Sequence, residues 1–207
     1  MHTRNHKLHV ISRGFTIIEL LVCLVIITII TTIILPSRKQ FEESLNLTNL
    51  AYDIALAIRE AQVYSTNVRQ ANPAGGTFDV GYGVQVTTNT NTFKLFADMD
   101  HNHIYNSPTD LVIRNYTIGG GSKVLEFCIV SGVPDYCAAY QSGFPSLYIS
   151  FKRPDSEACM TTGSVNALST PNCLALMQIS EGRITIQSSG GRTKVIKVFS
   201  NGQISVE

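Results

Sequence analysis

The chain has 207 residues, of which 44% are hydrophobic and 15% are charged, and its formal net charge at pH 7 is +1. This composition is typical of one folded domain with an additional element, and it excludes a disordered chain. Three of the 16 basic residues, Arg4, Lys7 and Arg13, precede Gly14, so the rest of the chain is slightly acidic and lacks a chain-wide footprint for nucleic acid.

An apolar segment covers residues 15–35 and contains one charged residue, Glu19. At about 1.5 Å rise per residue, a helix of this length crosses a hydrocarbon core of about 30 Å. No small-residue cleavage site follows the segment, so we expect it to remain on the mature protein as a transmembrane helix. The basic residues before it favour a cytoplasmic N-terminus, which places everything after Pro36 across the membrane.

Residues 13–37, RGFTIIELLVCLVIITIITTIILPS, resemble the N-terminus of a type IV prepilin or type II secretion pseudopilin. The shared features are a short basic leader, Gly14, Phe15, Glu19, an apolar helix and a proline after it. The resemblance implies that residues 1–14 are a leader, that a prepilin peptidase cuts between Gly14 and Phe15, and that the new N-terminus at Phe15 is methylated. It also implies an inner-membrane subunit that joins other pilins or pseudopilins in a filament.

Glu19 is an unusual residue in this segment, because a carboxylate in lipid is costly unless it has a partner. Cleavage would create a free amine at Phe15 of a neighbouring subunit, and we expect that amine to neutralise Glu19 when subunits pack together. The alternative is that Glu19 lies near the membrane interface and snorkels toward water.

Residues 36–70 have the pattern of an amphipathic helix that continues the apolar helix as one long spine. Pro36 removes a backbone donor, so we expect a bend or a looser junction there. Small and apolar residues at steps of three and four predict the face that packs on a core: Leu47, Leu50, Ile54, Ile58, Ala61, Ser65 and Val68.

From residue 77 to residue 207 the chain changes to short β-rich segments bounded by Gly, Asn, Pro and Ser. The predicted strands are 81–88, 92–98, 110–117, 123–130, 146–151, 173–180, 182–187, 193–199 and 203–206. Glycine-containing tripeptides predict hairpin turns at 181–183, 189–191 and 200–202. The expected fold class is α+β, with an antiparallel, sandwich-like head packed against the amphipathic half of the long helix.

Two later stretches, 95–116 and 179–207, are similar to the GspH/FimT family of pilin-like proteins. In the first stretch, a strand that ends in Asp98 enters an Asp- and Asn-rich loop, which leaves through Asp110. Membership of that family implies a minor subunit, located at the filament tip or in its initiating complex. A type IV pilus and a type II secretion pseudopilus both remain open.

The Asp- and Asn-rich loop is a candidate calcium site. Asp98, Asp100 and Asn102 place oxygen ligands at alternating positions, and Asp110 follows them. Two features depart from a calcium-binding loop, since His103 stands where an EF-hand needs glycine and Asp110 falls one residue late. The alternative is an Asx-rich turn whose side chains cap backbone amides without an ion. We expect no metal and no other cofactor.

Five cysteines divide between the two regions of the chain. Cys23 lies in the apolar helix, where a thiol behaves as a small apolar group. The other four, Cys128, Cys137, Cys159 and Cys173, lie in the β-rich head, and their even number predicts two disulfides in an oxidising periplasm. Of the three pairings, we favour Cys128 with Cys137 and Cys159 with Cys173, because short loops need little closure entropy.

The head contains no nucleophile elbow, no His-Glu-x-x-His, no complete phosphate loop and no dinucleotide fingerprint, so we expect no enzyme. DNA binding is the alternative function, since some GspH/FimT relatives take up DNA through a C-terminal Gly-Arg-x-Arg motif whose cations contact phosphates. Here Gln203 and Ser205 replace the two arginines. Other cations nearby are candidates for the same role: Arg192, Lys194, Lys197 and Arg183. The alternative for that cluster is a solvated hairpin.

Overall fold

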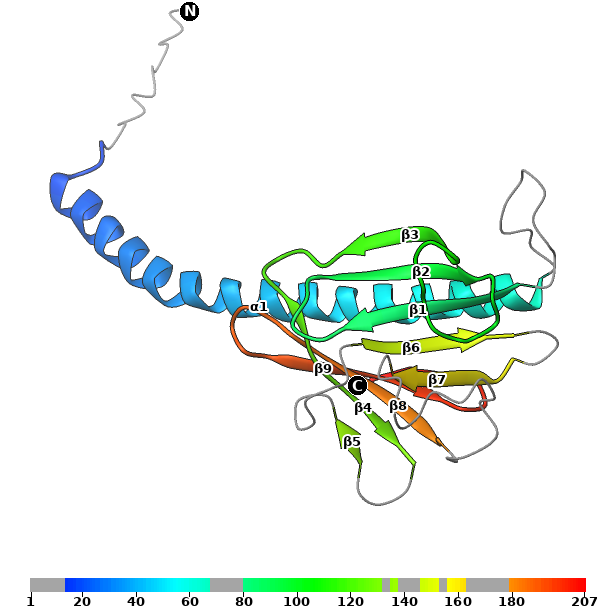
Figure 1. Ribbon diagram of the computed structural model, residues 1–207. Coiled ribbons are helices and arrows are strands. Elements are labelled where there is room, and N and C mark those ends of the chain that lie inside the picture. The colour runs from blue at the N-terminus through cyan, green and yellow to red at the C-terminus, as the bar shows by residue number, and fades with distance from the viewer. Residues whose placement is uncertain (1–13, 68–79, 132–134, 138–145, 153–155, 163–178) are drawn as a thin grey trace, which may run out of the picture. The chain divides into compact units, whose positions relative to one another are not determined.

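The computed structural model describes residues 14–67, 80–131, 135–137, 146–152, 156–162 and 179–207 (Figure 1). The chain divides into two compact units, Met1–Phe41 and Glu42–Glu207. The single helix among the described residues, α1, spans Ile17–Thr66 and contributes to both units. It is continuous through Pro36, so the predicted long spine is present, but it ends four residues before the predicted end at residue 70.

The head consists of two five-stranded sheets in which every pair of neighbouring strands is antiparallel (Figure 1). The first sheet contains, in spatial order, β3 (Leu111–Thr117), β2 (Thr92–Asp98), β1 (Gly81–Thr87), β6 (Ser146–Phe151) and β7 (Ala158–Thr162). The second contains β10 (Ile204–Val206), β9 (Thr193–Phe199), β8 (Glu181–Gln187), β4 (Lys123–Val130) and β5 (Tyr136–Cys137). The predicted α+β class with antiparallel sheets is confirmed.

One hydrophobic core joins one face of α1 to the inner faces of both sheets. The predicted helix face is buried from Leu47 to Ser65, and Val68 lies outside the described residues. The largest side chains in this core are fully buried aromatic rings: Tyr82 from β1, Phe127 from β4 and Phe151 from β6. Each such side chain contributes about 1.5 to 3 kcal/mol through burial, so packing against α1 holds the two sheets together.

The outer face of the first sheet is also covered. Phe96 is fully buried, although it lies on the face opposite to Leu95 and is not part of the main core. The ring of Tyr105 packs edge-on against Phe96, with ring centroids 5.7 Å apart. A Cβ at Gly83 would lie 2.8 Å from the Phe96 ring, so glycine makes room for it. The loop between β2 and β3, residues 99–110, thus folds back over the sheet.

The strands and turns of the structure differ from the predicted ones at one turn and at two additional strands. The turn predicted at 181–183 is wrong, because Gly182 lies within β8, where a Cβ would come 2.6 Å from Sδ of Met160. The strands β5 and β7 are absent from the predicted set. All five residues of β7 are buried, so this strand lacks the alternation of buried and exposed residues that marks a half-buried strand. The predicted strand 173–180 falls outside the described residues up to residue 178.

Candidate functional site

The start of α1 is built by a threonine that precedes the helix. Oγ1 of Thr16 accepts a hydrogen bond from the backbone N–H of Glu19 at 3.3 Å, and the Thr16 carbonyl accepts one from Leu20 at 3.2 Å. Thr16 is therefore the N-cap and Glu19 occupies the third helical position, which is the spacing of a capping box. A carboxylate in the first turn also interacts favourably with the helix dipole. The Thr-x-x-Glu spacing of residues 16–19 is the sequence signal for this helix start.

The residues of the predicted cleavage site, Gly14 and Phe15, precede the helix and are exposed. A Cβ built on Gly14 would meet no atom within 4 Å in the described part of the chain. Packing therefore does not require glycine at this position. An exposed peptide bond outside regular structure is also the kind that a peptidase reaches.

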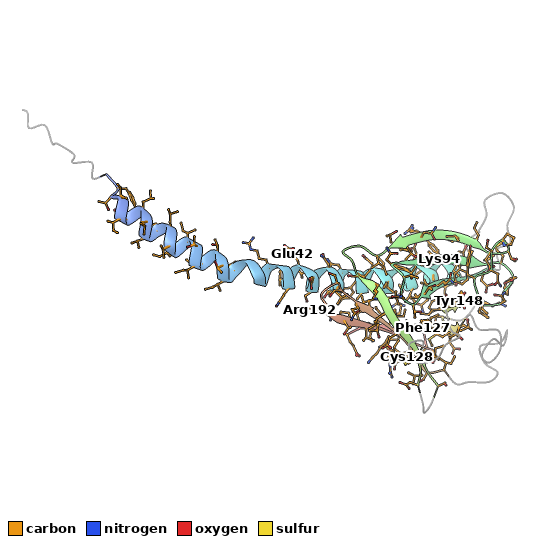
Figure 2. All side chains as sticks on the ribbon, turned by 60° about the vertical axis from the view of Figure 1, so that its left-hand side comes forward. Glu42, Lys94, Phe127, Cys128, Tyr148 and Arg192 are labelled. Atoms are coloured by element: carbon orange, nitrogen blue, oxygen red, sulfur yellow. A yellow bond between two sulfur atoms is a disulfide. The ribbon has the colours of Figure 1, made fainter. Side chains whose placement is uncertain are left out.

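The apolar part of α1, Ile17–Ile34, has a mean hydropathy of 2.9, contains no buried residue, and is long and apolar enough to cross a membrane. In Figure 2 its side chains project from the helix on all sides. Its three hydroxyls, of Thr28, Thr31 and Thr32, donate to backbone carbonyls of the same helix. This segment therefore satisfies its hydroxyl groups internally, as a lipid environment requires. Cys23 in this segment is a free thiol.

The acidic loop brings three carboxylates together: Asp98, Asp100 and Asp110 have oxygen atoms within 4.8 Å of one another. Each already accepts hydrogen bonds from backbone N–H groups, at distances from 2.7 to 3.3 Å. The donors are Asn102 and His103 to Asp98, Asn102 to Asp100, and Met99 and Asn106 to Asp110. Asn102 itself accepts a bond from Ile104 and donates to Asp100. These are the bonds of an Asx-rich turn, and the expectation that this loop holds no metal stays an untested prediction.

Burial dominates the electrostatics of this loop. It raises the pKa of Asp98 from 3.8 to about 6, and burial likewise raises the pKa of Asp110. The pKa of His103 is lowered, first by burial and then by the charges of Lys152 and His101. His103 has φ of 66°, which is the left-handed backbone conformation that favours glycine. An EF-hand has glycine at this position, and here histidine adopts that conformation.

An Asp, a His and a Ser meet beneath this loop, but not in the arrangement of a catalytic triad. Nδ1 of His103 lies 2.9 Å from Oγ of Ser150 and 3.9 Å from Oδ2 of Asp98. Both groups therefore contact the same ring nitrogen, whereas a triad uses the two nitrogens separately. Ser150 is also fully buried. The cluster holds the loop on the sheet and does not present a nucleophile.

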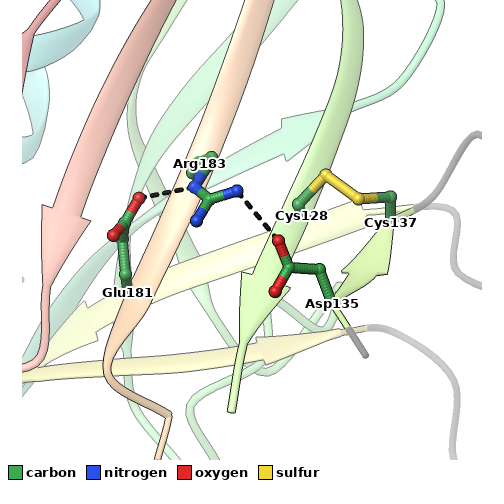
Figure 3. Close-up of a disulfide and its surroundings, with 5 residues drawn as sticks. All are labelled: Cys128, Asp135, Cys137, Glu181 and Arg183. Atoms are coloured by element: carbon green, nitrogen blue, oxygen red, sulfur yellow. Dashed lines mark hydrogen bonds and ion pairs between the residues drawn. A yellow bond between two sulfur atoms is a disulfide. The ribbon is translucent and has the colours of Figure 1, made fainter. Parts of the chain in front are cut away.

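A disulfide joins Cys128 of β4 to Cys137 of β5, which lie directly opposite each other in the antiparallel pair (Figure 3). This is the short-loop pairing that the sequence predicts. Cys159 is also disulfide-bonded, and its predicted partner, Cys173, lies outside the described residues. Next to the first disulfide, Arg183 of β8 bridges two carboxylates, with Nε 2.6 Å from Glu181 and Nη1 2.9 Å from Asp135 (Figure 3).

The cations proposed for DNA do not form one group in the structure. Arg183 is paired with two carboxylates, and Nζ of Lys197 lies 2.7 Å from Glu207. Lys194 is on the same face of β9 as the buried Ile196, and alternation places Lys197 on the opposite face. Arg192 is exposed in the turn between β8 and β9. In the part of the chain that the structure describes, these four charges do not form one phosphate-binding surface.

The turn between β8 and β9 also lies next to an acidic group. A Cβ built on Gly190 would lie 2.0 Å from Oε2 of Glu43, so the Glu43 carboxylate packs directly against this turn. A carboxylate at this position repels phosphate and weakens any attraction from Arg192. DNA binding stays a prediction that this geometry does not favour.

Comparison with known proteins finds a match at the N-terminus. The family model of the prokaryotic N-terminal methylation motif matches residues 11–35, which include Gly14, Phe15, Thr16 and Glu19. None of the curated proteins and none of the solved structures compared with the chain matches it. The motif supports a type IV pilin-like or pseudopilin-like subunit, and the apolar helix fits a membrane-anchored protein of that kind.

Proposed function

We propose that the chain is a minor pilin or pseudopilin of the GspH/FimT type, a structural subunit that enters a filament through α1. The observation that carries the pilin-like part of this proposal is the methylation motif at residues 11–35, which coincides with a capped helix start and an exposed apolar helix. The GspH/FimT type rests on the resemblance of residues 95–116 and 179–207 to that family. In this proposal, residues 1–14 are a leader, residues 15–35 span the inner membrane, and the head is periplasmic.

Glu19 is the assembly residue in this proposal. Before assembly, Glu19 lies in the first turn of α1, where the positive end of the helix dipole stabilises its negative charge. In a filament, the methylated amine of Phe15 on a neighbouring subunit would supply a positive charge within the apolar bundle. Pairing of the two charges would offset the cost of burying each of them.

An apolar stripe on the head part of α1 also supports assembly through the helix. Leu45, Tyr52, Leu56 and Val63 are between 42% and 66% exposed. Their spacings of seven, four and seven place them on one line of the helix, on the side opposite to the buried face. A line of large apolar side chains on a helix surface marks a contact with another protein. Helices of neighbouring subunits would cover this stripe.

Processing is tested by co-expressing the full chain with a prepilin peptidase and measuring the mass of the mature protein. We expect removal of residues 1–14 and one added methyl group on Phe15. Gly14→Val should block cleavage, because we expect the peptidase to require a small residue before the cut. Packing within the chain does not require glycine there. Gly119→Val is the matched control, since a Cβ there also meets nothing within 4 Å in the described part. An uncleaved wild-type chain would refute the proposal.

Assembly is tested with Glu19→Ala and the control Glu42→Ala, which removes an exposed carboxylate elsewhere on α1. The labelled Glu42 can be located on the helix in Figure 2. We expect both variants to insert and to be cleaved, and only Glu19→Ala to be lost from sheared filaments. Normal incorporation of Glu19→Ala would argue for the snorkelling alternative.

A further inference from the structure

An open groove with both polar and apolar lining lies between the last turns of α1 and the turn that joins β9 to β10. Its volume is about 540 Å³, and its lining includes Arg59, Gln62, Thr66, Ser156, Asn201 and Gln203. No carboxylate is among the described residues that line it. The groove therefore offers one cation, amides and hydroxyls to a ligand.

The wall of this groove is fixed by Gln62. Its Nε2 donates to the carbonyl of Ser156 at 2.9 Å and to the carbonyl of Gly202 at 3.4 Å. Gly202 has φ of 82°, and a Cβ there would clash with the Ser156 oxygen and with Nε2 of Gln62 on the helix. Only glycine allows the turn to approach the helix so closely. The turn is thus held in place before any ligand arrives, which lowers the entropic cost of binding.

Arg59 is held in the groove by the same glutamine. One of its N–H groups donates to Oε1 of Gln62. The amide of Gln62 therefore accepts a hydrogen bond from Arg59 through its oxygen and donates one to Ser156 through its nitrogen. Arg59 has no ion pair with any described residue, and the amide NH2 of Asn201 and the side chain of Gln203 have no hydrogen-bond partner there. A guanidinium keeps four further N–H donors in this arrangement. The groove therefore presents unused donors next to an unpaired positive charge.

We propose that this groove binds a carboxylate side chain of a neighbouring subunit. A planar guanidinium with free donors matches a carboxylate in a two-point geometry, and the amides of Asn201 and Gln203 add neutral donors. A single cation is too few for a nucleic-acid backbone, which needs several neutralised phosphates. The identity of the partner as a filament subunit rests on the proposed function, whereas the carboxylate chemistry does not.

The test is a titration of the ¹⁵N-labelled full chain in neutral detergent micelles, followed by NMR. The probe is an acetylated and amidated pentapeptide, Gly-Ser-Glu-Ser-Gly, and its counterpart has Gln in place of Glu. We expect the Glu peptide to shift the backbone amides of Asn201, Gly202 and Gln203 and the Nε signal of Arg59. The Gln peptide should leave them unchanged. In Arg59→Gln the apparent Kd should rise by about tenfold or more, because a charge-assisted pair is lost.

The control is Arg192→Gln, which removes an exposed cation from the turn between β8 and β9, outside the groove lining, and should leave the Kd unchanged. Equal shifts with both peptides, or an unchanged Kd in Arg59→Gln, would overturn the proposal. Shifts at these amides with hexathymidine but not with the Glu peptide would assign the groove to nucleic acid instead. Because no filament is required, a negative titration is independent of the cleavage and incorporation tests above.

Discussion

Oγ of Ser65, in the last turns of α1, accepts a hydrogen bond from the buried backbone N–H of Tyr82 at 3.0 Å. The same hydroxyl donates to the carbonyl of Phe151 at 2.7 Å. One buried serine therefore joins the helix to two adjacent strands, β1 and β6. The contact lies beside the edge-to-face pair of Tyr64 and Tyr82, whose ring centroids are 5.5 Å apart.

Ser65→Ala should lower the free energy of unfolding of the head by about 1 to 3 kcal/mol, because the substitution leaves a buried N–H and a buried carbonyl without this partner. The measurement is urea unfolding of the full chain in micelles, followed by tyrosine fluorescence. Thr66→Ala is the matched control, since the Thr66 hydroxyl bonds only to carbonyls of its own helix turn. Equal stability of the two variants would show that the Ser65 bridge contributes nothing.

The acidic loop should make the stability of the head depend on pH. The pKa of Asp98 is about 6 in the folded protein and 3.8 in the unfolded chain, so the folded state binds this proton more tightly. Stability therefore falls as pH rises from about 4 to about 6, by at most about 3 kcal/mol. Asp98→Asn should flatten this slope, even if it lowers stability at every pH.

The slope comparison separates Asp98 from its neighbours. The raised pKa of Asp110 acts in the same direction, whereas the lowered pKa of His103 reduces stability as pH falls below 6.5. Asp110 and His103 are both still present in Asp98→Asn, so the slope that remains reports those two groups. The slope that is lost reports Asp98 together with its electrostatic coupling to Asp110. Asp53→Asn, which removes an exposed carboxylate from α1, should keep the wild-type slope. An unchanged slope in Asp98→Asn would contradict the assignment.

The disulfide between Cys128 and Cys137 should contribute about 2 to 3 kcal/mol to the stability of the head. It closes a loop with a sequence separation of 9 and thereby restricts the unfolded chain. The double variant Cys128→Ser and Cys137→Ser should lower the free energy of unfolding by this amount, and the urea midpoint should fall by that free energy divided by the m-value. Cys23→Ser should not change it, because Cys23 is a free thiol outside the head. A midpoint equal to that of the wild type would show that the cross-link acts only locally.

The sequence predicts the parts of the fold that depend on periodicity. The steps of three and four from Leu47 to Ser65 identify the buried helix face, and most strands fall where alternation and turn residues place them. Alternation could also have divided the cation cluster, since Lys194 and Lys197 are an odd number of residues apart on β9. The capping residue Thr16 was likewise readable from its spacing to Glu19.

Other features depend on contacts between distant segments. Phe96 occupies the nominally solvent-facing side of β2, and only the fold-back of residues 99–110 explains its burial. Gly182 resembles a turn residue in the sequence, but it makes room for Met160 of another sheet. The groove at Arg59 combines α1 with a turn more than 130 residues later in the chain, as the Gln62 bond to Gly202 with a separation of 140 shows. No local pattern encodes such pairs.

The apolar stripe on α1 gives the last prediction, which separates assembly from stability. Leu56 is 66% exposed, whereas Ile54, two residues earlier, is fully buried in the core. Leu56→Gln should change the free energy of unfolding by less than about 0.5 kcal/mol, because the side chain is already in water. Ile54→Ala should lower it by about 2 to 5 kcal/mol through the loss of core contacts.

Although Leu56→Gln should leave the head folded, it should reduce incorporation of the subunit into sheared filaments. If neighbouring helices cover the stripe, Leu56→Gln removes apolar area from that contact and reduces incorporation while cleavage after Gly14 proceeds normally. Asn49→Gln, a polar change at an exposed position of the same helix, should assemble like the wild type. Full incorporation of Leu56→Gln would mean that subunits associate through the N-terminal apolar part of α1 without this stripe.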